Sequence, residues 1–145
     1  MTNIIQLLIV DDRDIIRDSF KLFFTESSGI YVAGEASDGI EALKLIKENN
    51  YDVVLMDLLM PNVSGIDATK NIKKIKPSTK ILANSFAINS FQVRDLIAAG
   101  ASGFILKDEN KNVYIDAIKT IYNDGSYFSD EISKKVNEKV LACLK

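Results

Sequence analysis

The stretch YDVVLMDLLMPNVSG, residues 51–65, places an acid at the end of a continuous apolar run. The run VVLM lacks the alternation of a one-sided sheet and is typical of a strand that is buried on both faces. Asp57 follows directly, and Ser64 can cap a helix that begins soon afterwards. The stretch therefore predicts a buried strand that ends in a carboxylate.

The same succession of a short apolar run and a segment of helical period occurs five times along the chain. The strand candidates are residues 4–10, 30–36, 53–57, 80–85 and 103–107. Asp38 and Ser64 are expected to cap helices, and Pro77 is expected to end one. Repeated strand and helix units predict a doubly wound α/β domain, in which helices cover both faces of a five-stranded parallel sheet.

The predicted domain occupies residues 1–125, and residues 126–145 form a C-terminal segment. Apolar side chains recur every four residues between 129 and 145, which predicts an extra C-terminal helix. This helix either packs on the domain or begins a connector to a further domain, and the pattern alone favours neither.

Composition excludes several classes of function. A chain of 145 residues with 47% hydrophobic residues suits one domain, and 18 Lys and Arg against 20 Asp and Glu leave no basic surface for direct nucleic-acid binding. Because the chain has no histidine, it cannot be a Ser-His-Asp hydrolase, a His-ligated metal enzyme or a phosphohistidine carrier. A single cysteine and the lack of an apolar run near ~20 residues favour a soluble cytoplasmic protein without a membrane partner.

Polar side chains stand at the ends of four predicted strands. Asp11 and Asp12 follow the first strand, Asp57 ends the third, Ser85 ends the fourth and Lys107 ends the fifth. Open parallel sheets bind ligands at the carboxyl ends of their strands. We therefore expect three carboxylates, one hydroxyl and one ammonium to converge at one edge of the sheet.

Each of these residues alone could be a helix cap or a solvated surface residue. Together, clustered carboxylates repel one another and need a cation, and an all-oxygen ligand set suits Mg²⁺ or Mn²⁺. With a metal bound, Asp57 is a plausible nucleophile toward a phosphoryl group. The Lys107 ammonium suits neutralisation of the phosphoryl oxygens, and the Ser85 hydroxyl suits a hydrogen bond to one of them.

Four pieces of sequence resemble the receiver domain of bacterial two-component response regulators. They are LLIVDD, VVLMDLLMPNVSG, Ser85 and GFILKD, and the resemblance covers residues 4–122. It implies a flavodoxin-like sheet and transfer of a phosphoryl group from the phosphohistidine of a sensor histidine kinase to Asp57. It also places Pro61 and Gly65 in the loop after the phosphorylated strand, where proline fixes φ and glycine allows the turn.

The resemblance further implies a role for each site residue. Asp12, Asp57 and the backbone carbonyl of Leu59 would ligate Mg²⁺, and Asp11 would act largely through water. Lys107 would pair with the phosphoryl group. Two further roles are implied, Ser85 as the switch hydroxyl and Phe104 as the aromatic side chain whose rotamer reports the switch, although plain core packing also accounts for Phe104.

The segments YVAGEASDGIEAL and NVYIDAIKTIYNDGSYFSDEI are similar to the NarL/FixJ subfamily, in which a LuxR-type helix-turn-helix domain follows the receiver. This similarity implies regulation of transcription, with DNA bound only through a domain outside residues 1–145. A stand-alone receiver of the same lineage is the other interpretation. Receivers of this type signal by changing an association surface, so a homodimer on phosphorylation is a further expectation.

Two residues depart from the family pattern. Phe86 replaces the usual small residue after the switch hydroxyl, and Asn84 occupies a strand position that is normally apolar. A phenyl ring beside the site would restrict entry of a phosphodonor or of hydrolytic water, unless it turns outward to pack on a neighbouring helix.

Three other functions compete with a phosphorylated receiver. A phosphohydrolase of the haloacid dehalogenase type needs a second acid where this chain has Leu59, and an FMN binder needs a hydroxyl-rich loop where this chain has the acidic DDRD. A degenerate receiver that only binds proteins is opposed by the complete set of acids, hydroxyl and lysine, but Phe86 keeps it open.

Overall fold

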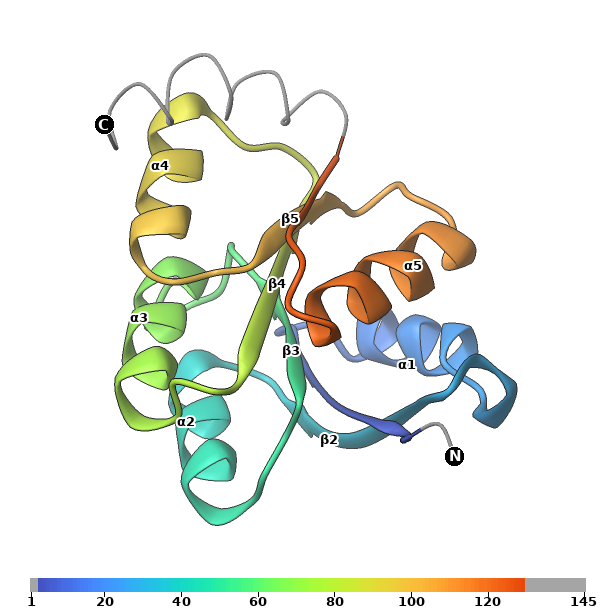
Figure 1. Cartoon of the computed structure of the whole chain (residues 1–145). Helices are drawn as coiled ribbons and strands as arrows, with labels where there is room; N and C mark the ends of the chain where they lie inside the picture. Colours follow the sequence, from blue (N-terminus) through green and yellow to red (C-terminus); the bar gives the residue numbers. More distant parts are fainter. Residues whose placement is uncertain (1–2, 130–145) are drawn as a thin grey trace.

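The apolar runs form the parallel sheet at the centre of the molecule (Figure 1). The computed structural model describes residues 3–129. Its five predicted strands are β1 Ile5–Val10, β2 Ile30–Ala36, β3 Val53–Asp57, β4 Lys80–Ser85 and β5 Gly103–Leu106. Strand order in the sheet is β2-β1-β3-β4-β5-β6, and every pairing is parallel. The fold is the predicted doubly wound α/β sheet, and strand order reverses between β1 and β3, where such sheets bind ligands.

A sixth strand, β6 Tyr127–Phe128, extends the sheet beyond β5 and was not predicted. Two residues are too short for a periodic pattern, so the sequence carries no signal for it. Gly103 allows this pairing, because a Cβ atom there would lie 2.1 Å from the carbonyl oxygen of Tyr127. β6 begins two residues after residue 125, where the sequence predicts the end of the domain. That boundary stays a prediction.

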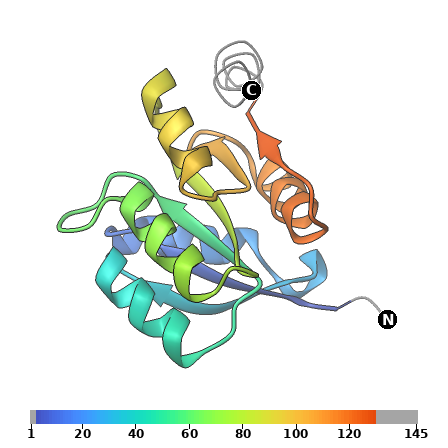
Figure 2. The same ribbon diagram turned by 60° about the vertical axis from the view of Figure 1, so that its left-hand side comes forward.

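Helices cover both faces of the sheet (Figures 1 and 2). Their bounds are α1 Asp14–Phe23, α2 Gly39–Glu48, α3 Gly65–Ile75, α4 Ser90–Ala98 and α5 Lys111–Tyr122, with a short 3₁₀ helix at Glu26–Ser28. The side chain of Asp38 caps α2 by accepting from Glu41 N–H, and that of Ser64 caps α3 by accepting from Asp67 N–H. Both predicted caps are confirmed.

The two faces of the sheet are packed differently. α1 and α5 cover one face with aromatic rings, and the ring centroids of Phe20 and Tyr114 lie 5.1 Å apart. α2, α3 and α4 cover the other face with a mainly aliphatic core, in which Ile46 and Ile72 are fully buried. Burial of these continuous apolar strands on both sides fixes where their last residues emerge.

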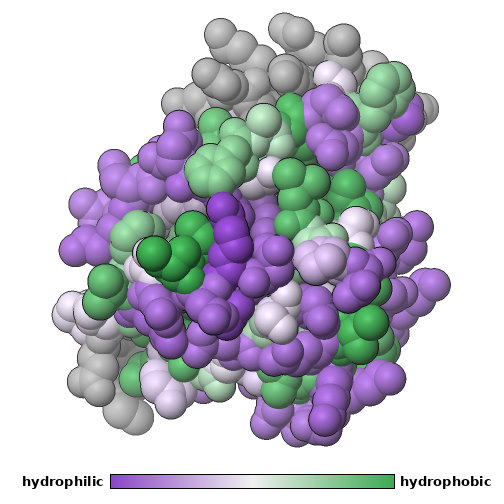
Figure 3. Space-filling view, turned by 180° about the vertical axis from the view of Figure 1, so that it is seen from behind, coloured by the Kyte–Doolittle hydropathy of each residue, from purple (hydrophilic) through white to green (hydrophobic). Residues whose placement is uncertain are grey.

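The C-terminal helix predicted between residues 129 and 145 lies outside the described residues except for Ser129. That serine is buried, and its Oγ accepts a hydrogen bond from Leu106 N–H over 3.1 Å. None of the helices described is long and apolar enough to cross a membrane. Seen from behind, the described surface shows apolar side chains in separate patches among hydrophilic ones (Figure 3).

Candidate functional site

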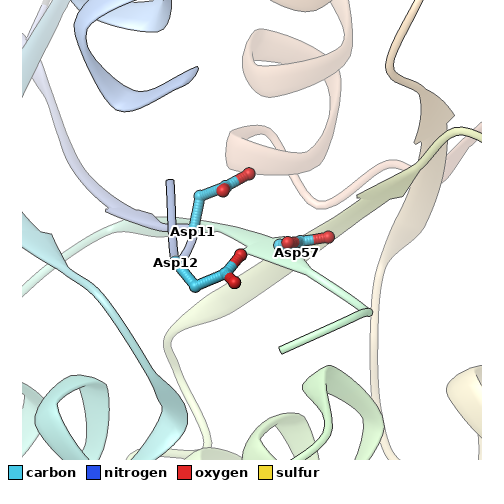
Figure 4. A group of neighbouring side chains, drawn as sticks. All are labelled: Asp11, Asp12 and Asp57. Carbon is cyan, nitrogen blue, oxygen red and sulfur yellow. The ribbon is translucent and has the colours of Figure 1, made fainter. Parts of the chain in front are cut away.

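Three carboxylates converge at the carboxyl ends of β1 and β3. Asp11 and Asp12 follow β1, Asp57 ends β3, and one carboxylate oxygen of each lies within 4.8 Å of the others. Figure 4 shows the three side chains gathered beside one another above these strand ends. Asp11 and Asp57 are 1% and 2% exposed, whereas Asp12 is open to solvent. The cluster thus has two buried acids and one at its mouth.

Lys107 supplies positive charge between the two buried acids. Its Nζ lies 2.8 Å from Asp11 Oδ2 and 3.2 Å from Asp57 Oδ1, and its side chain is 5% exposed. Lys107 reaches this position because it follows β5, and its N–H donates to the Ser85 carbonyl at the end of β4 over 2.9 Å. A buried lysine and two buried aspartates stabilise one another here, because each would be unfavourable without an opposite charge.

Backbone groups hold the two buried carboxylates in place. Leu59 N–H donates to Asp57 Oδ1 over 3.2 Å, and Arg13 N–H donates to Asp11 Oδ1 over 3.0 Å. These bonds come from the residues two positions after each acid, so the turn that ends each strand also orients its carboxylate.

The pKa of Asp57 is raised above its usual value. Burial is the largest cause, and the negative charge of Asp11 adds to it, while the Lys107 ammonium acts in the opposite direction. Ionised Asp57 is therefore incompletely compensated by the protein alone, and additional positive charge near the cluster would favour its charged form.

The cluster fits a hard divalent cation. Its ligand atoms are carboxylate oxygens without sulfur or imidazole, which is the set that Mg²⁺ and Mn²⁺ prefer. Asp11, Asp12 and Asp57 are the residues able to hold the ion, and exposed Asp12 leaves a route for it. The residues present thus have the ligand chemistry of the predicted magnesium site.

Of the other predicted site residues, two are buried and one is exposed. Ser85 is buried as the last residue of β4, and Phe104 is fully buried beside Val93 and Leu96 of α4. Phe86 is 62% exposed, and its ring centroid lies 5.5 Å from Lys107 Nζ. Phe104 thus packs in the core, while Phe86 lies at the mouth of the site.

The Phe86 ring also lies next to two other features at the mouth. Its centroid is 5.7 Å from Cζ of Arg13, and it lines a small hollow with Ile16 and Phe20 of α1. The ring thus borders helix α1 and the Lys107 ammonium at once, a position that fits both restricted access to the site and packing against a neighbouring helix.

Two residues that support the site were not singled out from the sequence. Arg17 of α1 donates through Nη1 to the Asp11 carbonyl over 2.6 Å and through Nε to Glu35 over 3.2 Å. Arg17 lies one turn into the helix that follows Asp11 and Asp12, and this spacing could have predicted a contact with them. Tyr114 of α5, whose hydroxyl donates to the Leu106 carbonyl next to Lys107 over 3.3 Å, has the spacing of an ordinary core residue, so the sequence carries no signal for this contact.

Gly65 has a different role from the one the sequence suggested. A Cβ atom at this position would lie 2.2 Å from the Asp57 carbonyl oxygen. Glycine is therefore needed for the close approach of α3 to the end of β3. Its φ angle is one that other residues also adopt, so the backbone conformation does not require glycine. This packing holds the loop after Asp57 against the strand.

Similarity to known proteins extends over most of the chain. Residues 7–119 match the family model described as response regulator receiver domain. The chain is 31% identical over 131 residues to the transcriptional regulatory protein DegU of Brevibacillus brevis, spanning 90% of this chain and 56% of DegU. It is 31% identical over 132 residues to the response regulator UvrY of Escherichia coli strain K12, spanning 91% of this chain and 61% of UvrY.

Solved structures show the same likeness. A two-component response regulator of the LuxR family from Aurantimonas sp. SI85-9A1 superposes with a TM-score of 0.87 at 29% identity, covering 94% of this chain and 98% of that one. The signal receiver domain of the putative response regulator NarL from Mycobacterium tuberculosis gives a TM-score of 0.79 at 28% identity, covering 83% of this chain and 98% of that one.

A doubly wound parallel sheet with an acid cluster at its switch point defines a signalling module of the receiver class. The chain belongs to the response regulator receiver family, and its relatives are regulators of the NarL/FixJ, LuxR-type kind that the sequence predicts. It is a signalling module of two-component systems and not a turnover enzyme, which sets aside the phosphohydrolase. The chain spans about three fifths of the length of the curated relatives it matches.

Proposed function

We propose that this domain accepts a phosphoryl group on Asp57 from the phosphohistidine of a sensor histidine kinase. The observation that carries the proposal is the position of Asp57, a buried carboxylate 3.2 Å from the Lys107 ammonium and within 4.8 Å of two further acids. This arrangement combines a nucleophile, a cation for the phosphoryl oxygens and ligands for a metal ion.

The step follows from that arrangement. A carboxylate oxygen of Asp57 attacks the phosphorus atom, a bond forms between them, and the bond from phosphorus to the kinase imidazole breaks with its electron pair left on the imidazole. Lys107 neutralises charge on the phosphoryl oxygens and leaves its ion pair with Asp11 to do so. Asp12, Asp57 and the Leu59 carbonyl would hold Mg²⁺, with Asp11 acting largely through water, and the ion would supply further positive charge.

The response to phosphorylation involves two other residues. The new group brings roughly one to two negative charges to the end of β3, by analogy with other phosphorylated side chains. Ser85 at the end of the neighbouring strand donates its hydroxyl to a phosphoryl oxygen, and Phe104 behind it changes its packing against α4. Phe86 at the mouth restricts access to the acyl phosphate.

The output proposed for the protein is control of transcription. It is supported by the family membership and by the description of DegU as a transcriptional regulatory protein. DNA is then bound by a helix-turn-helix domain outside residues 1–145, residues 126–145 begin the connector, and phosphorylation favours a homodimer. A stand-alone cytoplasmic receiver that acts through protein contacts is the alternative.

Substitution of Asp57 tests the phosphoacceptor role. The protein is exposed to Mg²⁺ and labelled acetyl phosphate, and incorporated label is followed in the parent, in Asp57→Asn and in Asp67→Asn. Asp67 is an exposed acid in the first turn of α3, outside the cluster, and serves as the matched control. We expect label in the parent and the control and none in Asp57→Asn; equal uptake by Asp57→Asn contradicts the proposal.

A further inference from the structure

A buried polar contact joins β4 to α5 inside an otherwise apolar layer. Asn84 of β4 is 1% exposed and Tyr114 of α5 is fully buried. The Asn84 side-chain amide donates to the Tyr114 hydroxyl over 3.4 Å, and that hydroxyl donates to the backbone carbonyl of Leu106 over 3.3 Å. Buried polar groups are unfavourable without partners, so these two side chains depend on each other.

The Leu106 carbonyl belongs to the peptide unit that leads into Lys107. Its oxygen receives the Tyr114 hydroxyl, and the N–H of the same peptide unit donates to the Ser85 carbonyl over 2.9 Å. The Leu106 carbonyl also accepts from Glu109 N–H over 3.2 Å, so this unit is held at its oxygen by α5 and the loop after β5, and at its N–H by β4. Rotation of the unit would move the root of the Lys107 side chain, whose ammonium lies between Asp11 and Asp57.

Packing fixes the Tyr114 hydroxyl in this place. The Tyr114 ring lies between α1 and α5, with its centroid 5.1 Å from that of Phe20 and 5.8 Å from that of Phe23. Burial also raises the pKa of the Tyr114 phenol, so the hydroxyl keeps its proton and donates at physiological pH. Because packed rings hold the Tyr114 hydroxyl, this hydroxyl restrains the Leu106 carbonyl more tightly than a freely rotating side chain would.

We propose that Tyr114, supported by Asn84, is a positioning residue that sets the place of the Lys107 ammonium through the Leu106–Lys107 peptide unit. In this role, the position of α5 determines the position of the Lys107 ammonium, which neutralises the phosphoryl group. It rests on the proposed function, in which Lys107 neutralises the phosphoryl oxygens. A purely structural role would only satisfy the buried Asn84 amide and would not act through Lys107.

A double-mutant cycle separates these two roles. The rate of phosphorylation by acetyl phosphate and Mg²⁺ is measured by intact mass for the parent, Tyr114→Phe, Lys107→Met and the double variant, with incubations long enough to follow the slow Lys107→Met chain. Tyr122→Phe removes a hydroxyl from the same helix at the opposite end of the sheet and is the matched control. Amide hydrogen exchange in the parent and Tyr114→Phe gives a second measurement that does not need phosphorylation.

We expect Tyr114→Phe to slow phosphorylation about twofold, because the lost hydrogen bond is long and the Leu106 carbonyl keeps its bond from Glu109 N–H, and to have no further effect in Lys107→Met. The Lys107 amide should exchange faster, while the amides of β1 and β3 keep their protection. Equal slowing in both backgrounds, no slowing at all, or unchanged exchange at Lys107 overturns the positioning role. If the parent itself takes up no phosphoryl group, the proposed function fails, and the exchange experiment still decides whether Tyr114 holds this peptide unit.

Discussion

At the carboxyl ends of the strands, Lys107 meets Asp11 and Asp57 with all three side chains at most 5% exposed. At the amino ends, Lys80 pairs with Asp124 on the surface, and the Asp124 side chain is 84% exposed. The charges at the carboxyl end of the sheet are therefore buried, whereas the ion pair at the amino end has an exposed member.

This difference distinguishes a candidate functional site from an ordinary surface ion pair. Ion pairs in water are weak because solvent screens them, whereas buried charges are unfavourable unless other charges compensate them. The carboxyl end carries two buried acids against one buried lysine and the half-exposed Arg13 guanidinium near Asp11, and the pKa of Asp57 is still raised by burial. A site with this ligand chemistry could hold a metal ion, whose positive charge would favour ionised Asp57.

Removal of the buried cation is expected to have the largest effect. Lys107→Met leaves buried Asp57 without its cation and buried Asp11 with only the half-exposed Arg13 guanidinium, 3.8 Å away, so the free energy of unfolding should fall by about 3 kcal/mol at neutral pH without Mg²⁺. The loss should shrink as pH falls, because protonation removes the uncompensated charges. Urea unfolding at neutral and acidic pH measures this, and an equal loss at both values would contradict the comparison.

Removal of one buried acid is expected to have the opposite sign. The pKa of Asp57 is raised in the folded protein, so ionisation at neutral pH disfavours the folded state relative to the unfolded chain. Asp57→Asn cannot ionise and should raise the free energy of unfolding at neutral pH by on the order of 1 kcal/mol.

The gain from Asp57→Asn should depend on pH. It should disappear as pH falls below the pKa of the unfolded chain, where the carboxyl group is neutral in both states. Asp67→Asn, at an exposed position, should stay within about 0.5 kcal/mol of the parent throughout. Urea unfolding without Mg²⁺ over a range of pH makes the measurement, and a difference between Asp57→Asn and the parent that does not change with pH would contradict the raised pKa.

Removal of the ring at the mouth is expected to change a rate by a smaller factor. Phe86 lies over the Lys107 ammonium, so Phe86→Ala should admit water and speed loss of the phosphoryl group about threefold, less than 1 kcal/mol in barrier. Phe91, an equally exposed ring on α4, gives the control Phe91→Ala. If Phe86→Ala changes neither phosphoryl loss nor uptake from acetyl phosphate, the ring does not control access.

Removal of the cation at the amino end, whose partner is exposed, is expected to have the smallest effect. Lys80→Met should change the free energy of unfolding by no more than about 0.5 kcal/mol, and less in high salt, since its partner Asp124 is exposed. Urea unfolding at two salt concentrations measures it. A loss comparable to that of Lys107→Met would remove the distinction between the two ends.

Much of the fold was predictable because buried parallel strands have a simple pattern. Continuous apolar runs and helix caps located all five long strands, and their order along the chain placed Asp11, Asp57 and Lys107 at the same edge. β6 escaped prediction because a two-residue pairing depends on the close approach at Gly103, which is a contact between distant segments.

By itself, then, the sequence determined the strands and the residues at their ends, because these depend on local apolar pattern and on the common direction of parallel strands. Only the tertiary structure decided that Lys107 lies between two buried acids, that the Phe86 ring lies at the mouth, and that Tyr114 reaches the Leu106 carbonyl. Those facts depend on side-chain directions and on packing between segments far apart in the chain, which no periodicity within one segment encodes.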